Sequence, residues 1–418
     1  MNTPLLNESK TLTRQHYWIV FLCWAGWVFD FYDLFVYSFL LIPIGQEFAF
    51  TKRELAWIYS LTLLMTGVGG ILFGMLSDRI GRKAVLQWTI VTYCIGTLMC
   101  AFSQSFWWLL FWRAVTGLGV GGEWGAGHAL ISETFPAERR GRFGALMQSG
   151  APVGVGLATL MGAFFTPAFG WRVTFAVSAI PALMVILIRH HMPESDVWSQ
   201  QRQAGKLSSF GSLLPELFTK QFRRITLLAF LLTAFNMAAY WFTYSWFPAY
   251  LKEDRALSMA QSGWWTLAIV FGELIGYTTF GEFSDRLGRK PAFTLFAWLM
   301  AGGLAAIALG WNFFYAYPLA LLLLMVVTGI GTGTWSNFGP MFAELYPTRI
   351  RNTALNTIYN LARATQFVTP ILIGILADFY GLVIGILLGA FFSFLAGAWI
   401  WLLPETKGRT IPEIDKQL

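Results

Sequence analysis

Residues 73–83 read Phe-Gly-Met-Leu-Ser-Asp-Arg-Ile-Gly-Arg-Lys, and residues 280–290 read Phe-Gly-Glu-Phe-Ser-Asp-Arg-Leu-Gly-Arg-Lys. The two copies lie almost half the chain apart. Two further pairs of segments match in the same order and at a nearly constant separation. They are Val115-Thr-Gly117 with Val327-Thr-Gly329, and Glu133-Thr-Phe-Pro136 with Glu344-Leu-Tyr-Pro347. We interpret the three matches as a duplication, so the chain is expected to consist of two similar halves.

The composition indicates that both halves lie in a membrane. Of the 418 residues 56% are hydrophobic and only 12% are charged, with a mean hydropathy of +0.56. A soluble protein has about 25% charged residues and could not bury this much apolar surface. The apolar runs have the length of about 20 residues that a membrane-spanning helix needs. We therefore predict an all-α membrane protein with twelve transmembrane helices in two pseudo-symmetric six-helix bundles. The helices are expected at 17–45, 55–76, 84–103, 106–131, 143–167, 171–190, 224–250, 261–281, 291–310, 314–341, 353–377 and 381–403.

The polar stretch at 192–222 predicts a linker between the bundles. The expected parts are an N-terminal bundle (1–191), a cytoplasmic linker (192–222) and a C-terminal bundle with a short tail (223–418). The distribution of basic residues sets the orientation, because cytoplasmic loops retain Lys and Arg. With both termini inside, only a few of the 29 basic residues fall elsewhere. Those in the outside loops are Lys52, Arg53, Arg172, Lys252 and Arg255, and those within helices are Arg113 and Arg363. We expect a multi-pass protein of the cytoplasmic (inner) membrane with both termini in the cytoplasm.

Several other classes are excluded by what the sequence lacks. The net charge of +7 fits cytoplasmic loops better than nucleic-acid binding. The cysteines Cys23, Cys94 and Cys100 lie in apolar runs without the spacing of a disulfide framework. There is no nucleophile elbow, phosphate-binding loop or metal-spaced His/Cys set, so we expect no enzyme, no cofactor and no metal. The N-terminus has no cleavable signal pattern, and the first helix is expected to remain as an anchor.

The repeated loop, Gly-x-x-x-Asp-Arg-x-Gly-Arg-Lys after the second and eighth helices, resembles the signature of the major facilitator superfamily, and the resemblance covers essentially the full chain. A second stretch, Gly117 to His128 followed by Glu133 to Gly141, is similar to the sialate:proton symporter branch, which carries sialic acid and other organic acids. Asp30-Phe-Tyr-Asp33 in the first helix fits that branch. Met192-Pro-Glu-Ser-Asp and Pro404-Glu-Thr-Lys-Gly-Arg-Thr410 are similar to sugar porters but are shared by several branches.

The charges of the repeated loops predict a gate at the cytoplasmic ends of the helices. Charges at helix ends can pair with exposed backbone groups and with each other. The functional interpretation is a latch that holds the outward-open state and breaks during transport. The alternative is a marker of topology. The gate residues are expected to be Asp78, Arg79, Arg82 and Glu133, repeated as Asp285, Arg286, Arg289 and Glu344.

Buried acids in the first half predict proton coupling. Asp30 and Asp33 share one face near the middle of an apolar helix, where a carboxylate is costly and faces a cavity or a partner. Arg113 fits the superfamily's Arg-x-x-x-Gly pattern and needs a carboxylate, which Asp30, Asp33 or Glu123 could supply. Protonation of that partner would release the pair; the alternative is a static pair. His128 is either a pH sensor or a structural histidine.

Polar residues of the second half predict the substrate site. Asn356, Asn360, Arg363 and Gln366 lie on one face of the eleventh helix. Arg363 suits bidentate recognition of a carboxylate, unless it pairs with Glu273. The remaining predicted ligands could instead serve ordinary packing. They are Gln148, which could face Asn360, and Asn236, Tyr240 and Asn337.

These features together predict a secondary transporter that takes up an organic anion with protons by alternating access. The anion would be a sialic acid, a sugar acid or a monocarboxylate. The expected partners are this small anion, protons and the lipid bilayer, and the protein is expected to act as a monomer. The alternatives are a neutral-sugar proton symporter, which Arg363 argues against, and a non-transporting membrane receptor.

Overall fold

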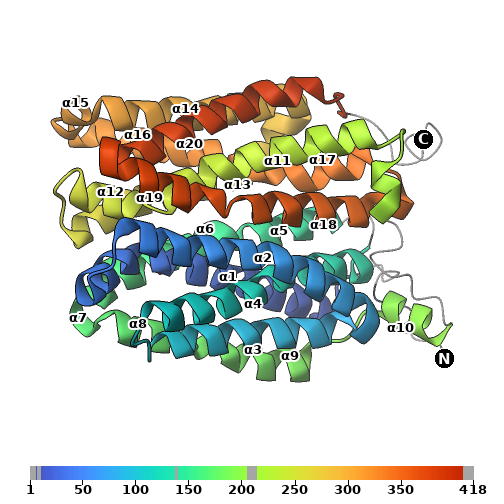
Figure 1. Ribbon diagram of the computed structural model, residues 1–418. Coiled ribbons are helices and arrows are strands. Elements are labelled where there is room, and N and C mark those ends of the chain that lie inside the picture. The colour runs from blue at the N-terminus through green and yellow to red at the C-terminus, as the bar shows by residue number, and fades with distance from the viewer. Residues whose placement is uncertain (1–5, 7–10, 137–139, 205–213, 408–418) are drawn as a thin grey trace.

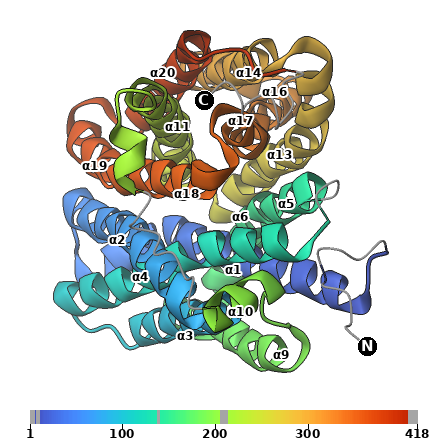
Figure 2. The same ribbon diagram turned by 90° about the vertical axis from the view of Figure 1, so that its right-hand side faces the viewer.

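The computed structural model describes residue 6 and residues 11–136, 140–204 and 214–407, and all regular structure in these ranges is helical. Residues 205–213 of the predicted linker, Ala137 to Arg139 and the tail from Gly408 lie outside the described residues. The helices form two groups, one above the other in Figures 1 and 2. We call α1–α10 the first half and α11–α20 the second half.

The first half contains long helices and several short ones. Its elements are α1 (Arg14–Phe48), α2 (Lys52–Ile80), α3 (Arg82–Cys100), α4 (Phe106–Thr134), α5 (Arg140–Gln148), α6 (Gly150–Leu160), η2 (Met161–Phe165), α7 (Thr166–Phe169), α8 (Trp171–Val177), η3 (Ile180–Leu183), α9 (Met184–His191) and α10 (Asp196–Gln203). Helix α10 lies within the stretch that the sequence predicts as a linker.

The second half begins with a short turn of 3₁₀-helix, also within the predicted linker. Its elements are η5 (Leu214–Phe218), α11 (Arg223–Tyr244), α12 (Phe247–Glu253), α13 (Met259–Leu287), α14 (Arg289–Leu309), α15 (Trp311–Tyr315), α16 (Pro318–Gly331), η6 (Thr332–Asn337), α17 (Phe338–Leu345), α18 (Thr348–Thr365), α19 (Val368–Tyr380), α20 (Val383–Trp399) and η7 (Ile400–Leu402).

Ten helical segments of the described residues are long and apolar enough to cross a membrane. The 29-residue helices α4 and α13 are not among them. Both have ample length for the bilayer, at about 1.5 Å per residue, and both carry buried charged residues that lower their hydropathy. Counted with the ten, they would give the predicted twelve. Many large side chains, such as Trp107 and Phe379, are exposed, as expected for a surface that faces lipid.

Helices α2 and α13 begin and end in the same way, which is the structural counterpart of the sequence repeat. The Thr51 hydroxyl accepts the N–H of Glu54, and Ser258 does the same for Gln261, each as part of a capping box. Both helices end at a glycine with positive φ, 103° at Gly81 and 108° at Gly288. Only glycine adopts that conformation without strain, so the two signature loops turn alike.

Five of the predicted helices are interrupted in the structure. One is the run at 171–190, which is divided among α8, η3 and α9. The run expected at 143–167 is divided between α5 and α6, and 224–250 between α11 and α12. The run at 314–341 contains the 3₁₀-segment η6, and 353–377 is divided between α18 and α19. Proline lies close after most of these breaks, at Pro152, Pro248, Pro340 and Pro370. Apolar periodicity alone does not reveal such breaks, because both parts of the helix remain apolar.

Candidate functional site

Charged side chains are buried at the centre of the molecule, where an unpaired charge is costly. Asp30 and Asp33 come from α1, Arg113 and Glu123 from α4, and each of the four is at most 1% exposed. The second half contributes two more, Glu273 from α13 at 0% and Arg363 from α18 at 2%.

Asp33 and Arg113 form a closed ion pair. Arg113 Nη1 lies 2.6 Å from Asp33 Oδ1, and the Thr97 hydroxyl donates to the other carboxylate oxygen. The guanidinium also lies over the ring of Tyr37, 5.0 Å from its centroid. Of the three carboxylates that the sequence leaves open as partners of Arg113, the structure therefore selects Asp33. This pair joins α1 to α4 within the first half.

Asp30 and Arg363 face each other across the two halves without a direct bond. Neither carboxylate oxygen of Asp30 and neither terminal nitrogen of Arg363 has a hydrogen-bond partner among the described residues. Glu123 and Arg363 are the charged groups that act most strongly on Asp30. The guanidinium of Arg363 lies over Trp27 of α1, 5.8 Å from the ring centroid. The predicted alternative, a pair between Arg363 and Glu273, is not formed in the described structure.

Glu123 is accommodated by a glycine. A β-carbon at Gly26 would lie 1.4 Å from Glu123 Oε1, so the absence of a side chain there lets the carboxyl group approach α1. The structure thus gathers Asp30, Glu123 and Arg363 into one cluster, which we call the central cluster. Asp33 and Arg113 lie beside it as a separate pair.

The polar face of α18 lies against the first half over most of its length. A β-carbon at Gly70 of α2 would lie 2.1 Å from Asn360 Oδ1, and one at Gly125 of α4 would lie 3.0 Å from Asn356 Oδ1. Asn360 donates to the carbonyl of Asn356 at 3.0 Å, and its Oδ1 has no partner among the described atoms. Gln366, at the end of the helix, turns to the second half and donates to the carbonyl of Ala234 at 3.2 Å.

An aromatic stack joins the two halves beside the central cluster. Trp124 of α4 and Tyr359 of α18 are stacked at 4.1 Å with an interplanar angle of 9°. The indole N–H of Trp124 donates to Gln148 Oε1 at 3.1 Å. His128 packs against Trp124 with ring centroids 4.7 Å apart. Gln148, predicted to face Asn360, therefore contacts this stack, while Asn360 faces α2.

The predicted residues of α11 and η6 lie on the other side of the junction. Tyr240 packs edge-on against Phe35 of α1 at 5.6 Å and against Trp335 at 5.8 Å. Asn236 Oδ1 accepts a hydrogen bond from Thr334. Asn337 donates to Met341 Sδ at 3.4 Å. The amide nitrogen of Asn236 and the amide oxygen of Asn337 have no partner in the described part of the chain.

The helix interruptions coincide with these residues. Gln148 ends α5, Asn337 ends η6, and Gln366 follows the last residue of α18. Broken helices at the junction of two repeats typify substrate sites of secondary transporters, because the interrupted backbone exposes polar groups to the site.

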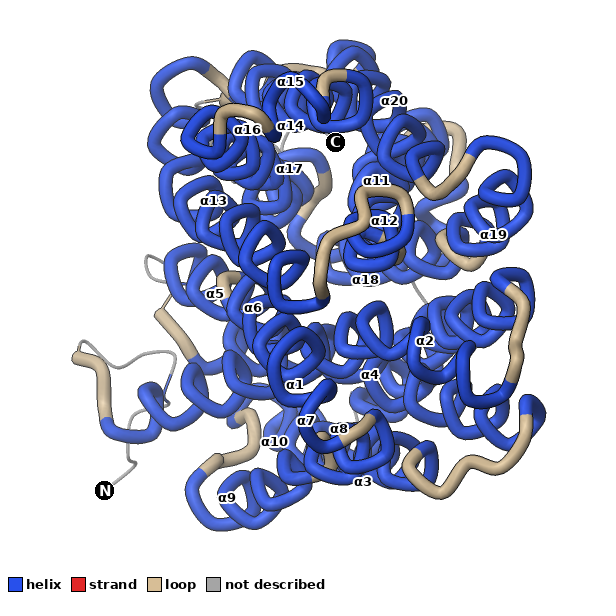
Figure 3. Tube along the Cα trace, turned by 90° about the vertical axis from the view of Figure 1, so that its left-hand side faces the viewer, coloured by secondary structure: helices blue, strands red, loops and turns tan. Residues whose placement is uncertain are grey.

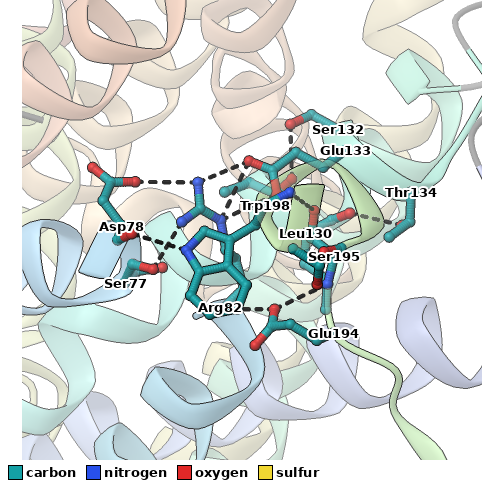
Figure 4. A network of polar contacts seen from close by, with 12 residues as sticks. Ser77, Asp78, Arg82, Leu130, Ser132, Glu133, Thr134, Glu194, Ser195 and Trp198 are labelled. Carbon is teal, nitrogen blue, oxygen red and sulfur yellow. Dashed lines mark hydrogen bonds and ion pairs between the residues drawn. The ribbon is translucent and has the colours of Figure 1, made fainter. Parts of the chain in front are cut away.

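The repeated loops form two matching ion-pair networks. In the first half Arg82 binds both Asp78 (3.1 Å) and Glu133 (2.8 Å), as Figure 4 shows. The Arg82 side chain also donates to the carbonyl of Ser77 at 2.8 Å. Arg79 of the same loop is exposed.

In the second half Arg289 binds Asp285 (2.7 Å) and Glu344 (2.8 Å). Arg286 pairs with Glu282 on the surface. The predicted partners of the loop arginines are thus found in both halves. The pairs of Arg82 and Arg289 join helices within one half, and neither network reaches the other half among the described residues.

Two ion pairs do join the halves, at the end opposite the termini. Lys52 lies 2.9 Å from Glu253, and Arg53 lies 3.0 Å from Asp378. Figure 3 views this end, where α2 lies beside α19 and α1 beside α12.

A profile described as the Major Facilitator Superfamily matches residues 23–258 and 229–417. The chain belongs to the major facilitator superfamily. A probable 4-methylmuconolactone transporter of Cupriavidus pinatubonensis is 30% identical over 405 residues, 94% of this chain and 92% of the relative. The sialic acid transporter NanX of Escherichia coli is 28% identical over 376 residues, 87% of this chain and 88% of the relative.

A solved structure has the same fold. The xylose transporter XylE of Escherichia coli, in a partially occluded inward-open conformation, superposes with a TM-score of 0.78 at 20% identity, covering 95% of this chain and 100% of that one. At this identity the likeness shows the fold alone. The predicted superfamily, the resemblance to sialic acid carriers and the helical membrane fold are confirmed. The relatives of this chain are transporters and not enzymes.

A pair of capping carboxylates was not predicted from the sequence. Glu194 accepts the backbone N–H groups of Arg82 (3.0 Å) and Lys83 (3.2 Å) at the start of α3. Glu405 accepts those of Arg289 and Lys290, both at 3.0 Å, at the start of α14. Each carboxylate thus satisfies amides that a helix N-terminus leaves without partners.

Partial burial alone would raise the pKa of Glu405. The N–H donors of Lys290, Lys407, Arg289 and Thr406 outweigh that effect and lower the pKa below its ordinary value. Both capping glutamates follow a proline, at Pro193 and Pro404. This Pro-Glu dipeptide, repeated at nearly the same separation as the signature loops, is the signal that could have revealed the caps.

Proposed function

We propose that this protein is a proton-coupled symporter that imports an organic anion by alternating access. The observation that carries the proposal is Arg363, whose guanidinium is 2% exposed and has two terminal nitrogens without hydrogen bonds among the described residues. Arginine binds a carboxylate through two parallel hydrogen bonds. Two relatives are named for carboxylic acids, 4-methylmuconolactone and sialic acid, which supports this class of substrate.

The balance of buried charge supports coupling to protons. Apart from Arg82 of the first signature loop, the buried charged groups of the described residues are four carboxyl groups and two guanidinium groups. An anionic substrate would therefore add negative charge to a site already rich in acids. The acids are Asp30, Asp33, Glu123 and Glu273, and the cations are Arg113 and Arg363. Burying uncompensated charge is costly, and binding a proton to an acid removes that cost.

In the proposed cycle, the proton and the anion bind to adjacent groups. In the substrate-free state of this cycle, the carboxylate of Asp30 would attract the Arg363 guanidinium across the junction. Protonation within the pair Asp30 and Glu123 removes that attraction, and the guanidinium can then bind the substrate carboxylate. The pair of Asp33 and Arg113 serves as a fixed support of α1. Trp124, Tyr240 and Tyr359 would form the apolar and aromatic wall of the site.

The movement would be a rocking of the N-terminal bundle (1–191) against the C-terminal bundle (223–418), joined by the linker at 192–222. The ion pairs of Lys52 and Arg53 support closure of the end opposite the termini in this conformation. The distribution of basic residues supports a cytoplasmic position for both termini. The networks of Arg82 and Arg289 would act as the latch by fixing the ends of the helices that meet at the cytoplasmic side.

Uptake into proteoliposomes tests the proposed function. N-acetylneuraminic acid, 4-methylmuconolactone and xylose would each be offered under an inward proton gradient, with and without a protonophore. We expect one of the acids to accumulate, the external medium to become more alkaline, and the protonophore to abolish accumulation. Accumulation of xylose instead would favour the neutral-sugar symporter. Binding of an acid without flux would favour the receptor.

A further inference from the structure

Glu273 is a buried carboxyl group that the central cluster does not include. It lies in α13 with 0% exposure, and neither of its oxygens has a hydrogen bond of normal geometry among the described residues. The hydroxyl groups of Tyr240 and Tyr244 of α11 lie beside it. The hydroxyl group of Tyr277, one turn further along α13, is the third one close to Glu273.

The elements packed against α13 provide no cation for this group. Helix α6, η2, α16 and η6 contain no charged residue. Helix α14 carries its charges at its first two residues, where Arg289 is already paired with Asp285 and Glu344. Helix α12 carries Lys252 and Glu253 at its far end, where Glu253 pairs with Lys52. Helix α11 has its charged residues, Arg223 and Arg224, at its first two positions. Among the described residues, the titratable groups that interact with Glu273 are the three tyrosines.

A carboxylate in this position would be uncompensated. Moving an unpaired ion out of water is costly even after the protein relaxes, and a buried acid therefore takes up a proton instead. Asp33 differs, because its carboxylate is paired with Arg113 and accepts a hydrogen bond from Thr97. Asp30 differs as well, because Arg363 acts on it from across the junction. Glu273 has neither kind of support.

We propose that Glu273 is a second proton-carrying group, located in the second half, which holds a proton in this conformation and releases it when the site opens to water. On release the O–H bond of the carboxylic acid breaks, the proton passes to water, and the carboxylate remains. The hydroxyl groups of Tyr240 and Tyr244 can then donate hydrogen bonds to the carboxylate. The ligand of this site is therefore a proton.

The consequence of this second proton for transport rests on the proposed function. One proton at the central cluster and one at Glu273 would accompany a single monovalent anion. The net movement is then one positive charge inward for each cycle, and an inside-negative membrane potential would drive uptake.

The protonation state can be tested without a substrate. Infrared spectra of the purified protein in lipid would be recorded at neutral pH for the wild type, Glu273→Gln and Tyr244→Phe. We expect a carbonyl band of a protonated carboxylic acid that is lost in Glu273→Gln. In Tyr244→Phe, which removes a neighbouring hydroxyl but no carboxyl group, the band should remain. Identical spectra of wild type and Glu273→Gln would overturn the proposal. If that variant does not fold, absence of the protonated-carboxyl band from the wild type would do so.

The charge stoichiometry is a second test. Uptake of N-acetylneuraminic acid into proteoliposomes would be measured with and without an inside-negative potassium diffusion potential. We expect the potential to accelerate uptake by the wild type and to lose this effect in Glu273→Gln. An equal acceleration in both proteins would contradict the role of Glu273. Absence of uptake by the wild type would instead count against the proposed function, while the infrared result would still decide the protonation of Glu273.

Discussion

Asp33 and Arg113 are both fully buried and joined at 2.6 Å, while Asp30, one turn earlier on the same helix, has no hydrogen bond among the described residues. Two carboxylates on one helix face thus have different environments. The first is tied within the first half, and the second faces Arg363 of the second half. The difference supports the proposal in which Asp33 stabilises α1 and Asp30 exchanges protons.

We predict that breaking the Asp33–Arg113 pair on one side will destabilise the protein strongly. Asp33→Leu or Arg113→Met alone leaves a buried charge without its partner, which costs about 3–5 kcal/mol. The double variant removes both charges and should recover most of the loss. Thermal unfolding of the purified proteins in one detergent would measure this. Single variants as stable as the wild type would show that the pair does not support α1.

Arg363→Ala should abolish uptake of the transported acid, and Arg363→Lys should lower kcat/KM by about 100-fold or more, because a lysine keeps the charge but cannot bind a carboxylate through a planar fork. The matched control is Arg224→Ala, which removes an exposed arginine at the start of α11. Unchanged uptake by Arg363→Ala at equal amounts of protein in the membrane would remove Arg363 from the substrate site.

The scaffold could be predicted from the sequence because the repeat carries it. The two signature loops, their partners Glu133 and Glu344, and the apolar runs are all local patterns, and each has its expected counterpart in the structure. The partner of Arg113 could not be predicted. Asp30 and Asp33 share one helix face, and only the packing of α1 against α4 decides which carboxylate the guanidinium reaches.

The least predictable features depend on contacts between the halves. The approach of Arg363 to Trp27, and the stacking of Trp124 on Tyr359, join residues that are far apart in the chain and have no repeat counterpart. The environment of Glu273 is similar in this respect. The sequence suggested only that it could neutralise Arg363, whereas the structure surrounds it with tyrosines.

Gly67 of α2 should be intolerant of substitution, because it is a point of close contact between the halves. A β-carbon there would lie 2.4 Å from Ala364 Cβ and 2.8 Å from Ala364 Cα of α18. Gly67→Ala must therefore push the two helices apart, at a cost of about 1–3 kcal/mol for this conformation. Gly74→Ala, in the same helix with nothing within 4 Å, is the control. Initial uptake rates should fall in the first variant only, and equal rates in both would contradict the contact.

The cap formed by Glu405 should contribute stability that depends on pH. Since the backbone amides lower its pKa, the contribution is present at neutral pH, above the ordinary value of about 4, and is lost as the pH falls through the lowered value. Glu405→Gln should lower stability at pH 7 by about 1 kcal/mol, as loss of a helix cap does.

The difference in stability between wild type and Glu405→Gln should disappear as the solution becomes strongly acidic. Thermal unfolding measured across a range of pH would show this. Glu282→Gln, which removes an exposed surface pair with Arg286, is the control and should change little. A gap that stayed constant down to the lowest pH would show that the charge of Glu405 is not what stabilises the loop.

Reversing the charge of Lys52 should shift the equilibrium between conformations, and reversing that of Glu253 as well should restore it. Because this pair is half-exposed, its loss in Lys52→Ala is worth at most about 1 kcal/mol, a change of about fivefold in population. Lys52→Glu adds repulsion and should open that end further, whereas Lys52→Glu with Glu253→Lys should restore the wild-type distribution.

Spin labels on cysteines introduced at the exposed positions Phe102 and Phe313 would report the separation of the halves. The native cysteines are buried and should not react. If the double reversal remained as open as Lys52→Glu, the pair would not be what closes this end.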